Sequence, residues 1–163
     1  MSTERQLVVV WRRVDADELD LLERDPDAGG LLMADSDPEQ LFDLGRAWHA
    51  VHMLLNGSPW GGTGPAFDAV LGGTVLGDPS TYEPVRVLLP ERVRAVAALL
   101  ADLPGEQLRT RFTHRAFRQA EVYPDVWDRA DVLTGFVLPA YERLRALYVE
   151  AAAAGDALLV QLT

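Results

Sequence analysis

Two histidines are the clearest candidates for chemistry in this sequence. His49 and His52 lie three residues apart within residues 41–57, and side chains at this spacing share one face of a helix. Gly45 and Asn56 extend the same strip, each four residues beyond a histidine. Three roles stay open for the imidazoles: hydrogen bonding to a backbone carbonyl, metal binding, and acid–base or ligand contact near neutral pH.

Other reaction signatures are missing from the sequence. There is no HExxH motif, and further metal ligands would have to come from elsewhere, so we expect neither a metal nor a cofactor. The chain has no cysteine, which excludes disulfides and thiolate chemistry. It also has no lysine, which excludes a P-loop lysine and a Schiff base. Ser58 is followed by a proline and does not form a nucleophile elbow, and the glycines of residues 61–65 lack the spacing of a phosphate loop.

The histidines belong to a predicted central helix. Asp37 followed by Pro38 is typical of a helix start, and we predict a helix from there to Asn56, with Gly57 as its C-terminal cap. The stripe expected to face the core comprises Leu41, Leu44, Trp48, Val51 and Leu55. His49 and His52 would then lie along the edge of this buried stripe.

The remaining elements predict an α+β fold. Apolar runs predict strands at residues 7–11, 85–89 and 157–162. Helices are expected at residues 15–24, 66–71, 90–103, 106–112, 113–121 and 128–154, the last with a kink or a break at Pro139. We expect one domain over residues 1–163. Its small mixed sheet would include both terminal strands and be covered by four to five helices.

Charge is distributed unevenly along the chain. The net charge of −10 argues against nucleic acid and membrane surfaces as partners. From Asp15 to Asp43 the only basic residue is Arg24, whereas arginines outnumber acids between residues 86 and 118. The acids of the first stretch are Asp15, Asp17, Glu18, Asp20, Glu23, Asp25, Asp27, Asp35, Asp37, Glu39 and Asp43. This asymmetry indicates a protein partner, solvated helix faces, or neutralisation within the fold.

The chain start has no signal-peptide pattern, and no apolar run reaches the length of a membrane span, so we expect a cytoplasmic protein.

Five ordered sequence blocks span most of the chain. They are RAWHAVHMLL at residues 46–55, AVLGG at 69–73, YEPVRVLLPERV at 82–93, VYPDVW at 122–127 and AAAAGDALLVQL at 151–162. Together these blocks resemble the YfbM-like bacterial family. The resemblance implies an α+β domain of unknown function, with no established substrate, cofactor or catalytic residue. Glu83 departs from it, because we expect a glycine before Pro84 in many relatives.

These blocks suggest a shared cavity. We hypothesise that Trp48, His49, His52, Asn56, Arg86, Tyr123 and Trp127 line one ligand pocket, although each tryptophan alone is typical of a core residue.

The sequence leaves two hypotheses for the function of the protein. The first is a non-catalytic binding or protein-interaction module that uses the acidic stretch Asp15–Asp43, for which an inhibitor or immunity-type role is one form. The second is a small-ligand-binding protein or enzyme, with Arg86 holding an anion and His49 or His52 acting as base. We favour the first because the sequence holds no complete catalytic set.

Overall fold

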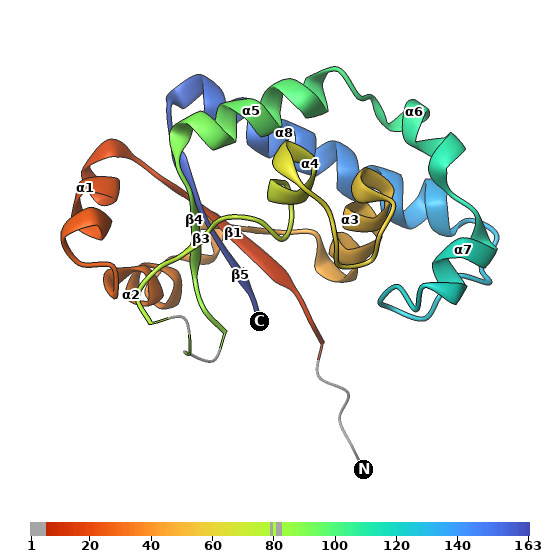
Figure 1. Cartoon of the computed structure of the whole chain (residues 1–163), viewed down its shortest axis with the longest axis horizontal. Helices are drawn as coiled ribbons and strands as arrows, with labels where there is room; N and C mark the ends of the chain where they lie inside the picture. The colour runs from red at the N-terminus through yellow and green to blue at the C-terminus, as the bar shows by residue number, and fades with distance from the viewer. Residues whose placement is uncertain (1–5, 79, 81–82) are drawn as a thin grey trace, which may run out of the picture.

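A five-stranded sheet forms the centre of the molecule (Figure 1). The computed structural model describes residues 6–78, 80 and 83–163, so Tyr82, the first residue of one resembling block, lies outside them. The strand order is β2-β1-β5-β4-β3. The strands are β1 Val9–Val14, β2 Leu41–Asp43, β3 Thr74–Val75, β4 Arg86–Leu88 and β5 Ala157–Leu162. The two terminal strands, β1 and β5, pair along their whole length, so the first and last elements close the centre of the sheet.

Eight α-helices are present in the described part of the chain. They are α1 Ala16–Arg24, α2 Ala28–Ala34, α3 Trp48–Asn56, α4 Gly64–Asp68, α5 Pro90–Ala101, α6 Gly105–Leu108, α7 His114–Gln119 and α8 Leu138–Ala154. Single turns of 3₁₀-helix occur at η1 Pro38–Gln40, η2 Gly45–Ala47 and η3 Arg109–Arg111, and a π-helical turn, η4, covers Leu133–Val137. No helix in the described ranges is both long and apolar enough to cross a membrane.

The sheet separates two hydrophobic cores. Alternate residues of β5 point to opposite faces, as the strand period requires: Leu158 packs in the larger core and Leu159 in the smaller one. The larger core lies beneath α3, α5 and α8, and the smaller one beneath α1 and α2. Figure 1 shows these two helical layers on opposite sides of the strands.

The structure confirms the α+β class, the two terminal strands and most helix positions. The Asp15 side chain caps α1 and forms a reciprocal capping box with Glu18, and α5 begins at Pro90 as predicted. The expected mixed sheet is corrected, because all four strand pairings are antiparallel. The apolar runs of this sequence did not reveal the relative direction of the strands. The helix count exceeds the predicted four to five because several short turns count separately.

The predicted central helix is wrong at its beginning and right at its end. Asp37 forms a capping box, but with Gln40, over one 3₁₀ turn only. Residues 41–43 then become β2, where Phe42 pairs with Trp11 and their rings meet edge to face at 5.7 Å. An apolar stripe at helical spacing was therefore overridden by pairing at the sheet edge. The helix α3 starts only at Trp48 and ends as expected at Gly57, whose φ is 68°.

At Pro139, where a kink or a break was predicted, a π-helical turn gives way to α8. Proline has no N–H to donate to the carbonyl four residues earlier, which is that of Gly135. The chain answers with a wider turn, in which the Leu138 N–H bonds to the Leu133 carbonyl five residues before it. Such turns occur often at functional sites. This one lines a cavity described below.

Candidate functional site

His49 is held by the backbone on both sides of its ring. Its side chain is buried in α3, with 1% of the residue exposed. Its Nδ1 atom accepts a hydrogen bond from the Tyr123 N–H at 2.8 Å. An amide N–H can only donate, so Nδ1 carries no proton, and the proton on Nε2 is donated to the Pro59 carbonyl at 2.7 Å. His49 is therefore a neutral imidazole with both nitrogens occupied.

His52 repeats this arrangement one helical turn later. It is fully buried, and its Nε2 lies 2.9 Å from the Gly61 carbonyl. Its Nδ1 lies 3.3 Å from the amide nitrogen of Asn56, which also donates to the Ala66 carbonyl at 3.0 Å. Because the Gly61 carbonyl can only accept, the proton again lies on Nε2. The two histidines and Asn56 thus fasten residues 59–66 to α3.

Burial sets the charge state of this strip. Desolvation lowers the pKa of both histidines below the ordinary value of 6.5, although their hydrogen bonds to carbonyls act in the opposite direction. The neighbouring His49 lowers the pKa of His52 further. Neither ring can take a proton from a ligand without first releasing a hydrogen-bond partner, the Tyr123 amide for His49 and the Asn56 side chain for His52. In the described ranges, no cluster of three or more acids and histidines is placed to hold a metal ion.

The structure brings together only part of the predicted ligand pocket. Trp48, His49 and Tyr123 form one packed group, with the Trp48 ring centroid 4.9 Å from that of His49 and 6.1 Å from that of Tyr123. Trp127 lies in a different aromatic group, 5.1 Å from Phe117. Arg86 lies on β4 opposite Val160 of β5. Among the described residues, no hydrogen bond or ring contact joins Arg86 or Trp127 to either histidine.

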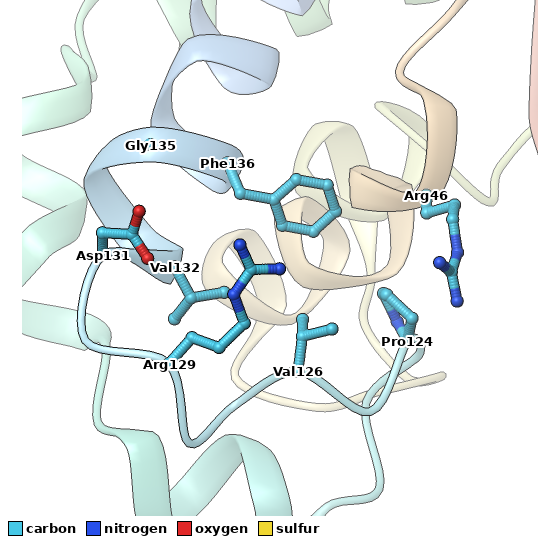
Figure 2. Close-up of a pocket in the computed structure, with 8 residues that line it drawn as sticks. All are labelled: Arg46, Pro124, Val126, Arg129, Asp131, Val132, Gly135 and Phe136. Carbon is cyan, nitrogen blue, oxygen red and sulfur yellow. The ribbon is translucent and has the colours of Figure 1, made fainter.

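A cavity of about 210 Å³ lies beside the histidine strip (Figure 2). We call it the arginine cavity. Its lining residues are Arg46, Pro124, Val126, Arg129, Asp131, Val132, Gly135 and Phe136. They come from η2, from the loop after Val122 and from the π-helical turn. His49 supports this wall indirectly, because the Tyr123 amide that it binds precedes Pro124 across a cis peptide bond.

A second hollow, also of about 210 Å³, lies on the smaller helical layer. We call it the leucine groove. It is lined by Arg12, Leu21, Ala28, Leu31, Leu32, Asp35, Ser36 and Gln40. Leu21 is 40% exposed and Leu31 is 65% exposed, and both line this one groove. The buried leucine of α1 is the neighbouring Leu22.

The base of the leucine groove is fixed by a buried arginine. Arg12 of β1 is 6% exposed, and its Nε donates to the Ser36 hydroxyl at 2.6 Å. Its Nη1 lies 2.9 Å from the Glu18 carboxylate. This single side chain therefore links α1 and the end of α2 to the sheet. The groove has a firm floor beneath its exposed leucines.

Comparisons with known proteins agree with this fold. The family model for a domain of unknown function, DUF1877, matches residues 6–161. The chain belongs to the DUF1877 family. A solved structure, that of YfbM from Escherichia coli, a protein of unknown function, is similar to this DUF1877 chain with a TM-score of 0.75 and 19% sequence identity. The similarity covers 96% of this chain and 99% of that one, which confirms the resemblance stated from the sequence. A search of curated proteins finds no match. At this identity the likeness establishes the fold alone, and the family description names no activity.

Proposed function

We propose that this DUF1877 protein is a non-catalytic interaction module that binds a basic protein partner through α1 and α2. The surface in question, the acidic surface, consists of the leucine groove and the exposed acids around it. The acids are Asp17, Asp20, Glu23, Asp25, Asp27 and Asp35. The observation that carries the proposal is the exposure of Leu21 and Leu31 in a groove on the same stretch of chain that carries these exposed acids.

The charge of this surface is not neutralised by the rest of the fold. Within the described residues, the only ion pair from the stretch Asp15–Asp43 joins Glu18 to Arg12. In the part of the chain that the structure describes, no ion pair links the stretch to the arginine-rich residues 86–118, where Arg92 pairs with Asp68 of α4 and Arg109 with Glu106. A concentrated negative field remains at α1 and α2. Such a field accelerates association with a positively charged partner and disfavours acidic ones.

The exposed leucines provide apolar contact area, which charged side chains alone do not supply. Protein interfaces combine an apolar centre, which supplies affinity, with a polar rim, which supplies orientation. Leu21 and Leu31 supply the apolar part here, Asp35 lines the same groove, and the other exposed acids lie on the same stretch of chain. The complementary partner is a basic segment that presents one apolar side chain to the groove. An inhibitor or immunity-type role is one form of such a module, in which the acidic surface covers a basic functional surface of its target.

The histidine strip supports this choice over an enzyme. A small-ligand site or enzyme at His49, His52 and Arg86 would need an imidazole nitrogen free to exchange a proton. Each ring nitrogen instead has a hydrogen-bond partner, and Arg86 forms no contact with the pair in the described residues. The geometry therefore favours binding through the acidic surface.

Two charge-matched variants test the proposal. The first combines Asp20→Lys, Glu23→Lys and Asp27→Lys on the acidic surface. The control combines Glu91→Lys, Asp125→Lys and Glu150→Lys, three exposed acids away from α1 and α2. Each substitution adds two positive charges, so both triple variants change the net charge equally. Affinity capture from the native cell extract, quantified by mass spectrometry, should recover a basic partner with the wild type and the control only.

Crosslinking locates the contact. A photo-reactive phenylalanine at Leu31 should crosslink the captured partner, whereas the same group at Val149, which is 47% exposed on α8, should not. Equal recovery by both triple variants, or equal crosslinking from both positions, would show that the acidic surface is not the binding site.

A further inference from the structure

The arginine cavity is a second candidate binding site, separate from the acidic surface. Its floor is apolar, with Pro124 and Val132 buried and Val126 and Phe136 half-buried. Its edge is charged, with Arg46, Arg129 and Asp131 all exposed. Figure 2 shows the Arg129 guanidinium reaching over Val126 and Val132 toward Phe136, with Arg46 and Asp131 at opposite sides. An apolar hollow with a few convergent polar groups is the usual form of a small-molecule site.

Arg129 is the distinctive member of the cavity. Its guanidinium makes no hydrogen bond or ion pair in the described part of the chain, whereas Arg12, Arg92 and Arg145 each form an ion pair. A guanidinium presents a planar fork of donors that matches a carboxylate or phosphate. This fork reaches over the apolar floor of the cavity and has no acceptor among the described residues. An anion is the partner that it fits.

Arg46 reinforces this preference from the other side. Its Nε lies 3.4 Å from the Tyr123 hydroxyl, and its guanidinium carbon lies 5.5 Å from the centre of the Tyr123 ring. These contacts hold the side chain in place and leave its terminal nitrogens without a hydrogen bond among the described residues. Two arginines against one aspartate make the cavity locally positive in a protein whose net charge is −10. A positive site on an acidic protein is selective for anions over cations.

The scaffold of the cavity is fixed before any ligand arrives. Tyr123 is tied to His49 through its amide and to the Leu7 amide through its hydroxyl, at 2.8 Å and 3.2 Å. The opposite wall is the π-helical turn, which contributes Gly135 and Phe136 to the lining. Preorganised walls reduce the ordering cost of binding.

We infer that the arginine cavity binds a small organic anion, a carboxylate or phosphate group attached to an apolar body. The Arg129 fork holds the anionic group, Arg46 adds a second positive charge, and Phe136 with Val126 and Val132 covers the apolar body. The volume of about 210 Å³ suits a body no larger than a substituted aromatic ring. The site does not share residues with the acidic surface, so either proposal can fail without the other.

A titration followed by amide NMR shifts tests the inference. The probes are 3-phenylpropanoate and phenyl phosphate as anions with an apolar body, 3-phenylpropan-1-ol as the neutral counterpart, and inorganic phosphate as an anion without a body. At about 10 mM, enough to occupy a millimolar site, at least one aromatic anion should shift amides of residues 125–136 in a saturable manner. The preferred anion distinguishes a carboxylate ligand from a phosphate ester.

Three variants separate a binding role from a structural one. Arg129→Gln should weaken binding at least about tenfold, because a charge-assisted bidentate contact is lost. Asp131→Asn should strengthen binding, because a repelling charge is removed. Arg94→Gln, an exposed arginine of α5, should change nothing. Arg129 has no protein partner to lose, so its variant should keep the wild-type amide spectrum.

The inference is overturned by several outcomes. It fails if no probe produces a saturable shift at the cavity, or if the alcohol binds as well as the anions. It fails equally if inorganic phosphate alone reproduces the response, or if Arg129→Gln and Arg94→Gln bind alike.

Discussion

Acidification should destabilise this protein through His49 and His52. Both imidazoles are neutral and buried in the folded state, and burial lowers the pKa of each below 6.5. In the unfolded chain they recover ordinary values near 6.5. As the pH falls through this value, the unfolded state binds protons before the folded state does. The free energy of unfolding must therefore fall with decreasing pH, from just above pH 6.5 down to the lowered folded-state pKa.

The size of the effect follows from proton counting. A group that is protonated in the unfolded state and neutral in the folded state costs about 1.4 kcal/mol of stability per pH unit. Two such groups give a limiting slope of about 2.7 kcal/mol per pH unit. Domains of this size are stable by only about 5–15 kcal/mol, so one or two pH units in this window should produce a measurable loss. Protonation of His49 Nδ1 would also expel the Tyr123 amide, since two donors cannot share that contact.

Urea unfolding between about pH 7.5 and about pH 5.5 measures this slope. The comparison is the His49→Ala, His52→Ala double variant, which lacks both titrating rings but keeps every carboxylate and His114. The variant should be less stable at neutral pH, and its stability should depend less steeply on pH. Nitrogen NMR of the wild-type rings should report an Nε2–H tautomer for both histidines. Equal pH slopes in wild type and variant would refute the reasoning, whatever their absolute stabilities.

Three further substitutions test the packing around the site. Arg92→Ala should destabilise by about 1–3 kcal/mol in urea unfolding, because the nearly buried Asp68 carboxylate loses both charged contacts, at 2.6 and 3.0 Å. Tyr148→Phe should cost about 1 kcal/mol in the same assay, since its buried hydroxyl donates to the Ala69 carbonyl at 2.8 Å. Gly57→Ala should lower the melting temperature, because an alanine at a φ of 68° costs about 1 kcal/mol of backbone strain. The added Cβ meets no atom within 4 Å, so no steric clash adds to this cost. A neutral result at Gly57 would show that the end of α3 relaxes.

Sequence reasoning located the histidine strip but not its partners. The spacing of His49 and His52 and the end of α3 at Gly57 follow from helix periodicity and cap chemistry. The acceptor carbonyls of Pro59 and Gly61 lie in an irregular loop, and the Tyr123 amide lies 74 residues along the chain. No local pattern encodes such contacts. Choosing between a structural and a chemical histidine therefore required the fold.

Glu83 adopts a backbone conformation that glycine favours. The family resemblance led us to expect glycine before Pro84, and Glu83 has a φ of 56°, in the left-handed region that glycine adopts most readily. Its backbone carbonyl accepts a hydrogen bond from the Gln161 side chain at 2.8 Å, which helps to hold this conformation. The glutamate at this position gave no sign of the positive φ. The edge strand β2 could not be predicted either, since its apolar spacing suits a helix equally well.

The exposed leucines and the arginine cavity were beyond the reach of sequence patterns for a different reason. An amphipathic pattern predicts which face of a helix is buried, and Leu21 lies one residue from the buried Leu22. Whether the neighbouring leucine is covered depends on how α2 lies across α1. Likewise, Arg46 and Arg129 are 83 positions apart in the sequence. They line one cavity only because η2 and the loop after Val122 flank the π-helical turn.

The position of the two proposed sites leads to one last expectation. The acidic surface belongs to the helical layer above the smaller core, and the arginine cavity to the layer on the other side of the sheet. They share no lining residue. Substitutions at sites without common partners are generally additive, so Leu31→Asp should abolish partner capture without changing 3-phenylpropanoate binding, and Arg129→Gln should do the reverse. If each substitution instead weakened both activities, the sheet would have to couple the two layers, and the description of two independent surfaces would be wrong.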